Sequence, residues 1–159
     1  VVVNSAGCSA HMKTYGELLA DDPRWRDRAA AFAAKVRDVT EMDLRPADHG
    51  LGRVTVHDAC HHIHAQGIAG QLRALLRAGG AECVEVADAG RCCGAAGVYG
   101  LTQPEMSATL RRAMAEAIDR AGSPVVAVAN PGCATQIARG LQEIGSTVTV
   151  VHPAELLNP

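Results

Sequence analysis

Short apolar runs that alternate with helix-like stretches constrain the fold of this chain more than any other feature. Three of these runs, residues 54–57, 83–86 and 125–129, are rich in valine, and each is followed by a stretch with apolar residues at helical spacing. Valine-rich strands that alternate with helices are typical of a parallel sheet whose two faces are both covered. The sequence therefore predicts an α/β fold with a Rossmann-like parallel sheet and helices on both faces.

Periodicity also predicts where the other elements lie. We expect further strands at 1–4 and 148–151, helices after Cys8 and around 25–36, 68–76, 106–117 and 137–144, and a polar loop at 45–52. Two local signals are more specific. Asp22 followed by Pro23 is expected to begin the second helix, and Thr102 with Glu105 has the spacing of a capping box for a helix whose apolar face starts at Met106.

Four cysteines follow closely on these apolar runs. They are Cys60, the adjacent pair Cys92 and Cys93, and Cys133. The carboxyl ends of parallel strands lie along one edge of a sheet, where open α/β folds place their sites. We therefore expect the four thiols to meet at the C-terminal edge of the strands. Four thiols on one patch indicate a metal ion or an iron–sulfur cluster.

The surroundings of these cysteines support this interpretation. Cys60 is expected at the start of a helix, where the helix dipole lowers the pKa of a thiol. Gly94 and Gly97 follow the cysteine pair and leave room for an inorganic cluster. Cys83 lies inside a predicted strand, so we expect it in the core, away from the other four.

Histidines near Cys60 leave the identity of the metal open. His57, His61 and His62 lie next to it in the sequence, and zinc binds mixtures of cysteine and histidine. The alternative is that these histidines are solvated or donate hydrogen bonds to cluster sulfur from outside the ligand set. A zinc-binding interaction module without redox function therefore stays open beside the cluster hypothesis, although the ligand spacings of zinc fingers are absent.

Composition narrows the class of protein. The 159 residues are enough for one domain with a real core. A formal net charge of −2 without a basic stripe argues against a nucleic-acid partner. No run of eighteen apolar residues and no signal segment is found, so we expect a soluble, cytoplasmic protein. Six cysteines in such a chain are better explained as ligands or redox thiols than as disulfides.

The first residues look like a copy of a later segment. Residues 3–8 and 128–133 both consist of an apolar strand end, a turn that contains asparagine, and Gly-Cys before a helix-like stretch. This pattern indicates an internal repeat whose first copy is represented only by its tail. The chain is then expected to be a piece of a longer protein.

The three cysteine segments resemble a known family. Residues 58–61 (Asp-Ala-Cys-His), 91–94 (Arg-Cys-Cys-Gly) and 130–133 (Asn-Pro-Gly-Cys) are similar to the cysteine-rich "CCG" domain, which occurs in heterodisulfide reductases and in the iron–sulfur subunits of glycolate and lactate oxidases. Connecting residues 4–8, 64–67, 99–105 and 152–157 resemble the glycolate oxidase (glycolate dehydrogenase) branch.

The resemblance implies a cofactor and a domain organisation. It implies a [4Fe–4S] cluster held by Cys60, Cys92, Cys93 and Cys133. It also implies a longer parent with a ferredoxin-like region and two CCG repeats, of which 1–50 would be the tail of the first repeat plus a helical connector and 51–159 the second repeat. Cys8 would then be an orphaned ligand of the incomplete first repeat.

The resemblance further implies a role in an oxidoreductase complex. A flavin subunit would oxidise glycolate, a 2-hydroxy acid, to glyoxylate, and this chain would pass the electrons towards a membrane acceptor, at the inner membrane through the complex. A heterodisulfide reductase-like or lactate utilisation subunit is the alternative within the family. In the heterodisulfide reductase branch the last segment reads Cys-x-x-Cys, whereas Asn130 stands at its first position here. Disulfide cleavage is therefore not carried over, and no catalytic residue is expected in this chain.

Overall fold

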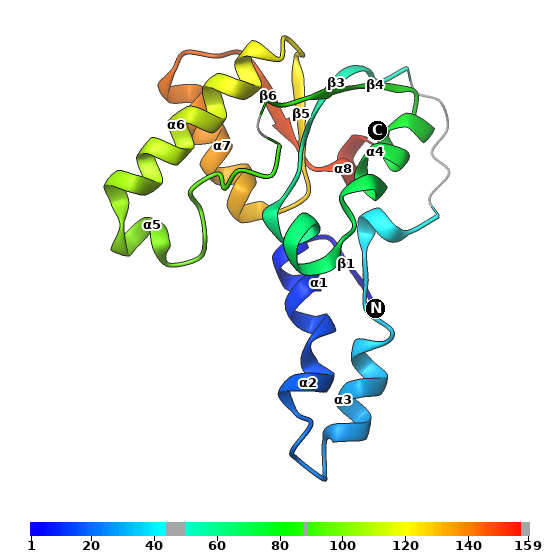
Figure 1. Ribbon diagram of the computed structural model, residues 1–159. Helices are drawn as coiled ribbons and strands as arrows, with labels where there is room; N and C mark the ends of the chain where they lie inside the picture. Colours follow the sequence, from blue (N-terminus) through cyan, green and yellow to red (C-terminus); the bar gives the residue numbers. More distant parts are fainter. Residues whose placement is uncertain (44–49, 88, 157–159) are drawn as a thin grey trace.

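A four-stranded parallel sheet forms the centre of the molecule. The computed structural model describes residues 1–43, 50–87 and 89–156, so most of the loop expected at 45–52 lies outside the described residues. The strands β3 (Gly52–His57), β4 (Ala81–Glu85), β5 (Val125–Val128) and β6 (Thr149–Val151) pair in the order β4-β3-β5-β6 (Figure 1). The predicted α/β fold with a parallel sheet is confirmed.

Helices cover both faces of this sheet. Leu72 and Leu76 of α4 (Ala69–Ala78) pack on one face with Ala127 of β5, and α8 (Pro153–Leu156) adds Leu156 there. Val126 and Val128 point to the other face, which α6 (Pro104–Arg120) and α7 (Pro131–Glu143) cover. A short helix, α5 (Tyr99–Thr102), precedes α6. Within the described ranges, no helix has the length and apolarity that crossing a membrane requires.

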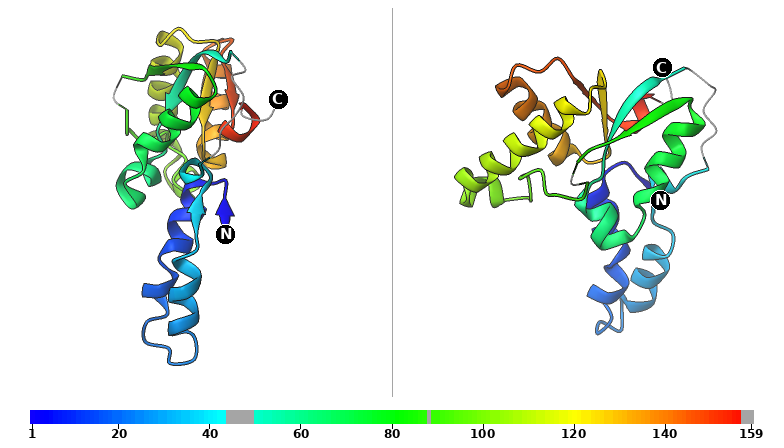
Figure 2. Two further views of the ribbon diagram at one scale, coloured as in Figure 1. Left: turned by 90° about the vertical axis from the view of Figure 1, so that its right-hand side faces the viewer. Right: turned by 45° about the horizontal axis from the view of Figure 1, so that its top comes forward.

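The N-terminal residues form a second, smaller unit. Strand β1 (Val2–Val3) pairs in parallel with β2 (Arg37–Asp38), and between them lie α1 (Ala6–Lys13), α2 (Tyr15–Leu18) and α3 (Arg26–Ala33). Helices α2 and α3 form a hairpin that extends away from the central sheet (Figures 1 and 2). The rings of Tyr15 and Phe32 stack at 5.7 Å between centroids and hold this hairpin together.

A buried carboxylate joins the two units. Asp38 precedes the 3-10 helix η1 (Val39–Glu41) and accepts hydrogen bonds from Thr40 and from Ser9 Oγ of α1, at 2.6 Å for the latter. Nε2 of His62, in the π-helix η2 (His61–Gln66), lies 3.2 Å from Asp38 Oδ2. Gln66 of the same helix donates to Ala6 O and Ser9 Oγ. Helix η2 is thus fixed between α1 and the sheet.

Two predicted helix starts are wrong. Helix α3 begins at Arg26, because Asp22 Oδ1 accepts the backbone N–H of Arg24 in a turn instead of capping the helix. Thr102 forms no capping box, because it is the last residue of α5, its hydroxyl donates to the carbonyl of Val98 just before that helix, and α6 starts after Gln103.

The predicted apolar face of α6 is also displaced. Met106 is half exposed, whereas Ser107, Arg111, Met114 and Ile118 face the core. The helix is rotated because it packs closely against α7, where Gly140 lets the backbone and stem of Arg111 approach. An arginine and a serine on the buried face are not what the apolar pattern indicates.

Candidate metal centre

The candidate site lies where the strand order of the sheet reverses. The chain goes from β3 to β4 on one side and then crosses to β5 on the other side of β3. Cys60 follows β3 and Cys133 follows β5, so these two cysteines flank the crevice between the carboxyl ends of neighbouring strands. Open α/β sheets bind their ligands at such a switch point. Cys92 and Cys93 come from the loop after β4.

The inner half of the site is a compact group of three side chains. One ring nitrogen of His57, Cys93 Sγ and Cys133 Sγ all lie within 4.8 Å of one another, and all three residues are buried. His57 is the last residue of β3, and Cys133 is the third residue of α7. Side chains from a strand end, a loop and a helix start therefore converge on one point with ligands that suit soft or borderline metals.

The outer half consists of Cys60 and Cys92, which are half-buried. Cys60 directly precedes η2, and its Sγ lies 3.7 Å from Nδ1 of the exposed His61. Cys92 Sγ accepts the backbone N–H of Gly94 at 3.3 Å. Negative charge on Cys92 or Cys93 raises the pKa of Cys60, and negative charge on Cys60 raises the pKa of Cys133. The four thiols therefore lie close enough to one another to interact electrostatically. The structure places all four predicted cysteines at this edge of the sheet.

The thiols differ in how easily they ionise. The hydrogen bond from Cys133 lowers the pKa of Cys93, and the imidazole of His57 acts in the same direction against the effect of burial. The same hydrogen bond and burial raise the pKa of Cys133. Within this hydrogen-bonded pair, Cys93 is therefore the thiol that ionises more readily. The pKa of Cys60 is raised, mainly by burial and then by the thiols of Cys92 and Cys93. The prediction that the helix dipole lowers the pKa of this thiol is therefore wrong.

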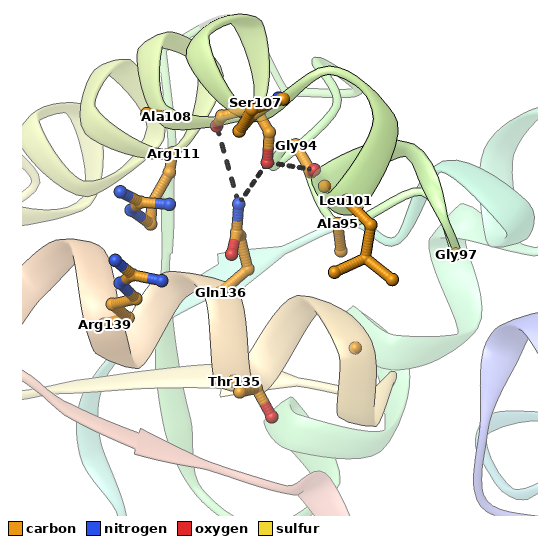
Figure 3. A pocket seen from close by; sticks show the side chains of 13 residues that line it. Gly94, Ala95, Gly97, Leu101, Ser107, Ala108, Arg111, Thr135, Gln136 and Arg139 are labelled. Carbon is orange, nitrogen blue, oxygen red and sulfur yellow. Dashed lines mark hydrogen bonds between the residues drawn. The ribbon is translucent and has the colours of Figure 1, made fainter.

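A hydrogen-bonded chain supports the loop that carries the cysteine pair. Ser107 Oγ donates to the carbonyl of Gly94 at 2.8 Å, and Gln136 Nε2 donates to Ser107 Oγ at 2.8 Å (Figure 3). These residues line a cavity of about 540 Å³ beside the site, together with Arg111 and Arg139. Helices α6 and α7 thus fix the position of the loop through side chains that the apolar pattern does not reveal.

Asn130 joins the N-terminal unit to the site. Its Nδ2 donates to Cys133 Sγ at 3.3 Å, while its Oδ1 accepts from Ser5 Oγ and from the backbone N–H of Gly7, both at 3.2 Å. Ser5 and Asn130 precede α1 and α7 with nearly the same backbone angles, φ −142° and ψ 115° against φ −147° and ψ 120°. In the sequence Asn130 stands out only as part of the repeated turn and as a missing cysteine, so this role was not predicted.

An arginine brace next to Cys60 was also not predicted. The guanidinium of Arg73, on α4, donates to both carboxylate oxygens of Asp58, at 2.9 and 2.7 Å, and to Glu85 at the end of β4. These bonds connect the turn that precedes Cys60 to the neighbouring strand. An arginine inside a predicted helix carries no signal of this kind in the sequence.

The remaining predicted residues lie apart from the buried group. His62 is fully buried but faces Asp38. His61 is exposed beside Cys60, and Cys8 is exposed on α1. Cys83 packs against the core cluster around Leu72, with its Sγ 3.9 Å from the Arg73 carbonyl, as expected for a core residue.

Comparison with known proteins gives matches over nearly the entire chain. Residues 54–138 match the family of cysteine-rich domains designated CCG. The chain is 36% identical to the probable glycolate oxidase iron-sulfur subunit of Bacillus subtilis and 31% identical to the glycolate oxidase iron-sulfur subunit of Escherichia coli, with 99% and 97% of this chain aligned. It spans 38% and 39% of those two proteins. It is also 32% identical to lactate utilization protein A of Exiguobacterium, with 99% of this chain and 67% of that protein aligned.

Proposed function

Because this chain belongs to the family of cysteine-rich CCG domains, we propose that it is the cluster-binding part of an iron–sulfur subunit of an oxidoreductase complex. The observation that carries the proposal is the convergence of Cys60, Cys92, Cys93 and Cys133 at the switch point of the sheet. The relatives that are named iron-sulfur subunits support an electron-transfer role.

The residues present fit an iron–sulfur cluster. The proposed ligands are the four cysteines, which suffice for one [4Fe–4S] cluster. Gly94, directly after the pair, lets the loop that carries these cysteines lie against α6, because a Cβ there would come within 2.5 Å of the Ser107 carbonyl oxygen. The N–H of Gly94 and the side-chain amide of Asn130 donate hydrogen bonds to the sulfurs of Cys92 and Cys133, which hold these two side chains in place. A bound cluster would supply one-electron transfer.

We propose glycolate as the substrate of the complex. Its oxidation to glyoxylate releases two electrons and two protons, which a flavin in a partner subunit would accept. This chain would receive the electrons singly and pass them towards a membrane acceptor, so it would bind no substrate itself. The names of the Bacillus and Escherichia relatives support this choice. We place the complex in the cytoplasm, peripheral to the inner membrane.

Lactate is the second candidate substrate. The lactate utilization protein A of Exiguobacterium is nearly as similar, and this chain spans 67% of it. Glycolate and lactate are both 2-hydroxy acids, and the flavin subunit would select between them. A heterodisulfide reductase-like role has less support, because Asn130 occupies the position of its additional cysteine. The alternative to an iron–sulfur subunit is a zinc-binding interaction module without redox function. Metal analysis of the purified protein would distinguish zinc from iron.

We also propose that the chain contains parts of two repeats. Residues 1–50 would be the tail of a first CCG repeat with a helical connector, and 51–159 the second repeat. The similar backbone angles at Ser5 and Asn130, each shortly before a Gly-Cys pair, support this division. Cys8 and Cys133 are both the third residue of the helix that follows.

Substitution in the complete complex tests the electron-transfer role. Cys133→Ser should abolish electron flow from glycolate to the acceptor but leave reduction of the flavin by glycolate intact, because the flavin performs the oxidation. Cys83→Ala is the matched control, since this half-buried thiol lies outside the group, and it should cost only about 1 kcal/mol of stability. Normal turnover in the Cys133→Ser complex would exclude the proposed role. Faster flavin reduction by lactate than by glycolate would identify lactate as the substrate.

A further inference from the structure

The cavity beside the cysteine-pair loop is not used by the proposed electron transfer. It is bordered by α6 and α7, has a volume of about 540 Å³ and is lined by none of the four cysteines. A volume of this size is usual for small-molecule sites. Its charged lining residues are Arg111 and Arg139, and no acidic residue of the described ranges lines it. The lining therefore favours an anionic ligand.

The guanidinium groups of these two arginines lie next to each other at one end of the cavity (Figure 3). Both bind Glu143. Arg111 donates to it through Nε and Nη2, at 2.9 and 3.0 Å, and Arg139 through Nε at 2.9 Å. One carboxylate thus faces two cations, which leaves one positive charge uncompensated. Arg111 is only 9% exposed, so water screens this charge incompletely.

The arginines also keep hydrogen-bond donors for a second anion. Within the described part of the chain, Nη1 of Arg111 and both terminal nitrogens of Arg139 bind no acceptor, because only the other nitrogens take part in the bonds to Glu143. Guanidinium groups bind carboxylates and phosphates through such paired N–H donors. This end of the cavity can therefore hold either kind of anion.

The rest of the lining indicates which class of anion fits. Ala95, Leu101, Pro104 and Ala108 give the cavity an apolar wall. Leu101 is 84% exposed, and in Figure 3 it lies at the opposite end from the guanidinium groups. The carbon atoms of an organic ligand would remove apolar surface of this wall from water, which an inorganic phosphate cannot do. An organic carboxylate therefore matches both ends of the cavity.

Hydrogen bonds connect this cavity to the loop that carries the cysteine pair. Gln136 donates to Ser107 Oγ, which donates to the carbonyl of Gly94, both at 2.8 Å. All three residues also line the cavity (Figure 3). A ligand that packs against them would restrict the motion of the loop.

We propose that this cavity binds a small organic carboxylate through Arg111 and Arg139, as an effector that stabilises the cysteine-pair loop. The ligand would act without being transformed, because no thiol or imidazole of the described residues lines the cavity. The proposal goes beyond the iron–sulfur function and does not depend on it, since the arginines and the apolar wall are separate from the four cysteines.

Calorimetric titration of the complete chain, prepared anaerobically, tests the site with propionate as the probe. Propionate should bind one equivalent with a dissociation constant of about 1 mM. Propionamide has nearly the same shape without the charge and should bind at least about tenfold more weakly. Inorganic phosphate should also bind more weakly, because it makes no use of the apolar wall.

Two arginine variants separate the site from general surface charge. Arg139→Gln should weaken propionate binding at least about tenfold. Arg112→Gln is the matched control, because Arg112 forms the same type of i,i+4 ion pair, with Glu116, but does not line the cavity. It should leave the affinity unchanged. Ala108→Leu changes no charge but occupies part of the cavity, and it should weaken binding as well.

Hydrogen exchange at residues 92–97 measures the effect on the loop. Saturating propionate should slow amide exchange there in the wild type and in Arg112→Gln, but not at the same concentration in Arg139→Gln. Equal propionate affinity in the wild type and in a folded Arg139→Gln variant would overturn the proposal. Equal affinity for propionamide or phosphate would overturn the assignment to carboxylates, and unchanged exchange at saturation would overturn the effect on the loop.

Discussion

Gly94 is the residue on which the shape of the cysteine-pair loop most depends. Its φ is +87°, and a Cβ there would lie 2.5 Å from the backbone oxygen of Ser107. Both the dihedral angle and the close approach require glycine. The same approach allows Ser107 Oγ to hold the Gly94 carbonyl. One glycine thus determines how the loop lies against α6.

Gly94→Ala should therefore destabilise the protein strongly. We expect a loss of about 3 kcal/mol or more, because overpacking against backbone adds to the cost of a positive φ. Gly97→Ala is the control, since φ is +60° there but no atom lies within 4 Å of the added Cβ. It should cost only about 1 kcal/mol. Urea unfolding of both variants measures the difference, and equal losses would mean that the contact with Ser107 is unimportant.

At the scale of elements, the crossing of α6 and α7 is the closest helix contact of the site. A Cβ at Gly140 would lie 2.9 Å from Arg111 Cγ, 3.0 Å from Ala115 Cβ and 3.1 Å from the Arg111 carbonyl. These two helices carry Ser107 and Gln136, which fix the Gly94 carbonyl. A change in helix spacing at the crossing would therefore reach the cysteine loop.

Gly140→Ala should lower the melting temperature although alanine is the better helix former. We expect a net loss of about 1–3 kcal/mol from overpacking. Gly70→Ala in α4 adds the same methyl group where no atom lies within 4 Å, so it should stabilise by up to about 1 kcal/mol. Thermal unfolding monitored by circular dichroism compares the two. Stabilisation by both substitutions would show that α6 and α7 can separate without cost.

The contact of β2 with η2 should make stability depend on pH. Burial raises the pKa of Asp38, but hydrogen bonds from His62, Ser9 and Thr40 outweigh it and lower the pKa from 3.8 to about 2. A lowered carboxyl pKa contributes stability that is complete above about pH 4 and is lost as the pH falls towards 2. The contribution is about 2 kcal/mol at neutral pH.

Comparison with Asp38→Asn isolates this carboxylate. The variant should be less stable than the wild type at pH 6, and the difference in unfolding free energy should shrink between about pH 4 and 2. Urea unfolding across this range provides the measurement. A difference that stays constant with pH would assign the loss to packing and not to ionisation.

Sequence periodicity predicts elements where one local pattern decides the structure. The valine-rich strands and the helices around Leu72 and Ile137 are of this kind. Strand β2 was missed because Arg37 and Asp38 are polar, and their pairing with β1 depends on contacts across the intervening helices. The buried face of α6 differs from the predicted one because α6 packs against Gly140 of α7. The apolar pattern of α6 alone does not contain this contact.

At the scale of the whole molecule, strand order determines which part of the site the sequence reveals. The four cysteines could be assigned to the C-terminal edge of the sheet from the sequence, because all strands of a parallel sheet end at the same edge. The contact of His57 with Cys93 and Cys133 requires the register of the sheet, which one-dimensional patterns do not contain. The link from Asn130 to Ser5 requires the position of the N-terminal unit.

Removal of the N-terminal unit should weaken the site. A chain of residues 51–159 lacks Ser5, Gly7 and Asp38, so it exposes Asn130, His62 and Gln66, which lose their partners. We expect a lower unfolding midpoint in urea and faster cleavage by protease near η2. A deletion of the tip of the α2–α3 hairpin, residues 20–24, is the control and should change the midpoint little. Equal stability of the truncated and complete chains would show that the second unit folds independently.

The bonds from Asn130 to Ser5 and Gly7 also limit which recombinants of related proteins can work. The bonded residues are 125 and 123 positions apart in the chain, whereas the family match covers only residues 54–138. A chimera that exchanges just the matched segment would take Asn130 from one parent and the residues that bond it, Ser5 and Gly7, from the other. Breakpoints that keep both loops from the same parent should therefore give functional hybrids more often than breakpoints at the borders of the conserved domain.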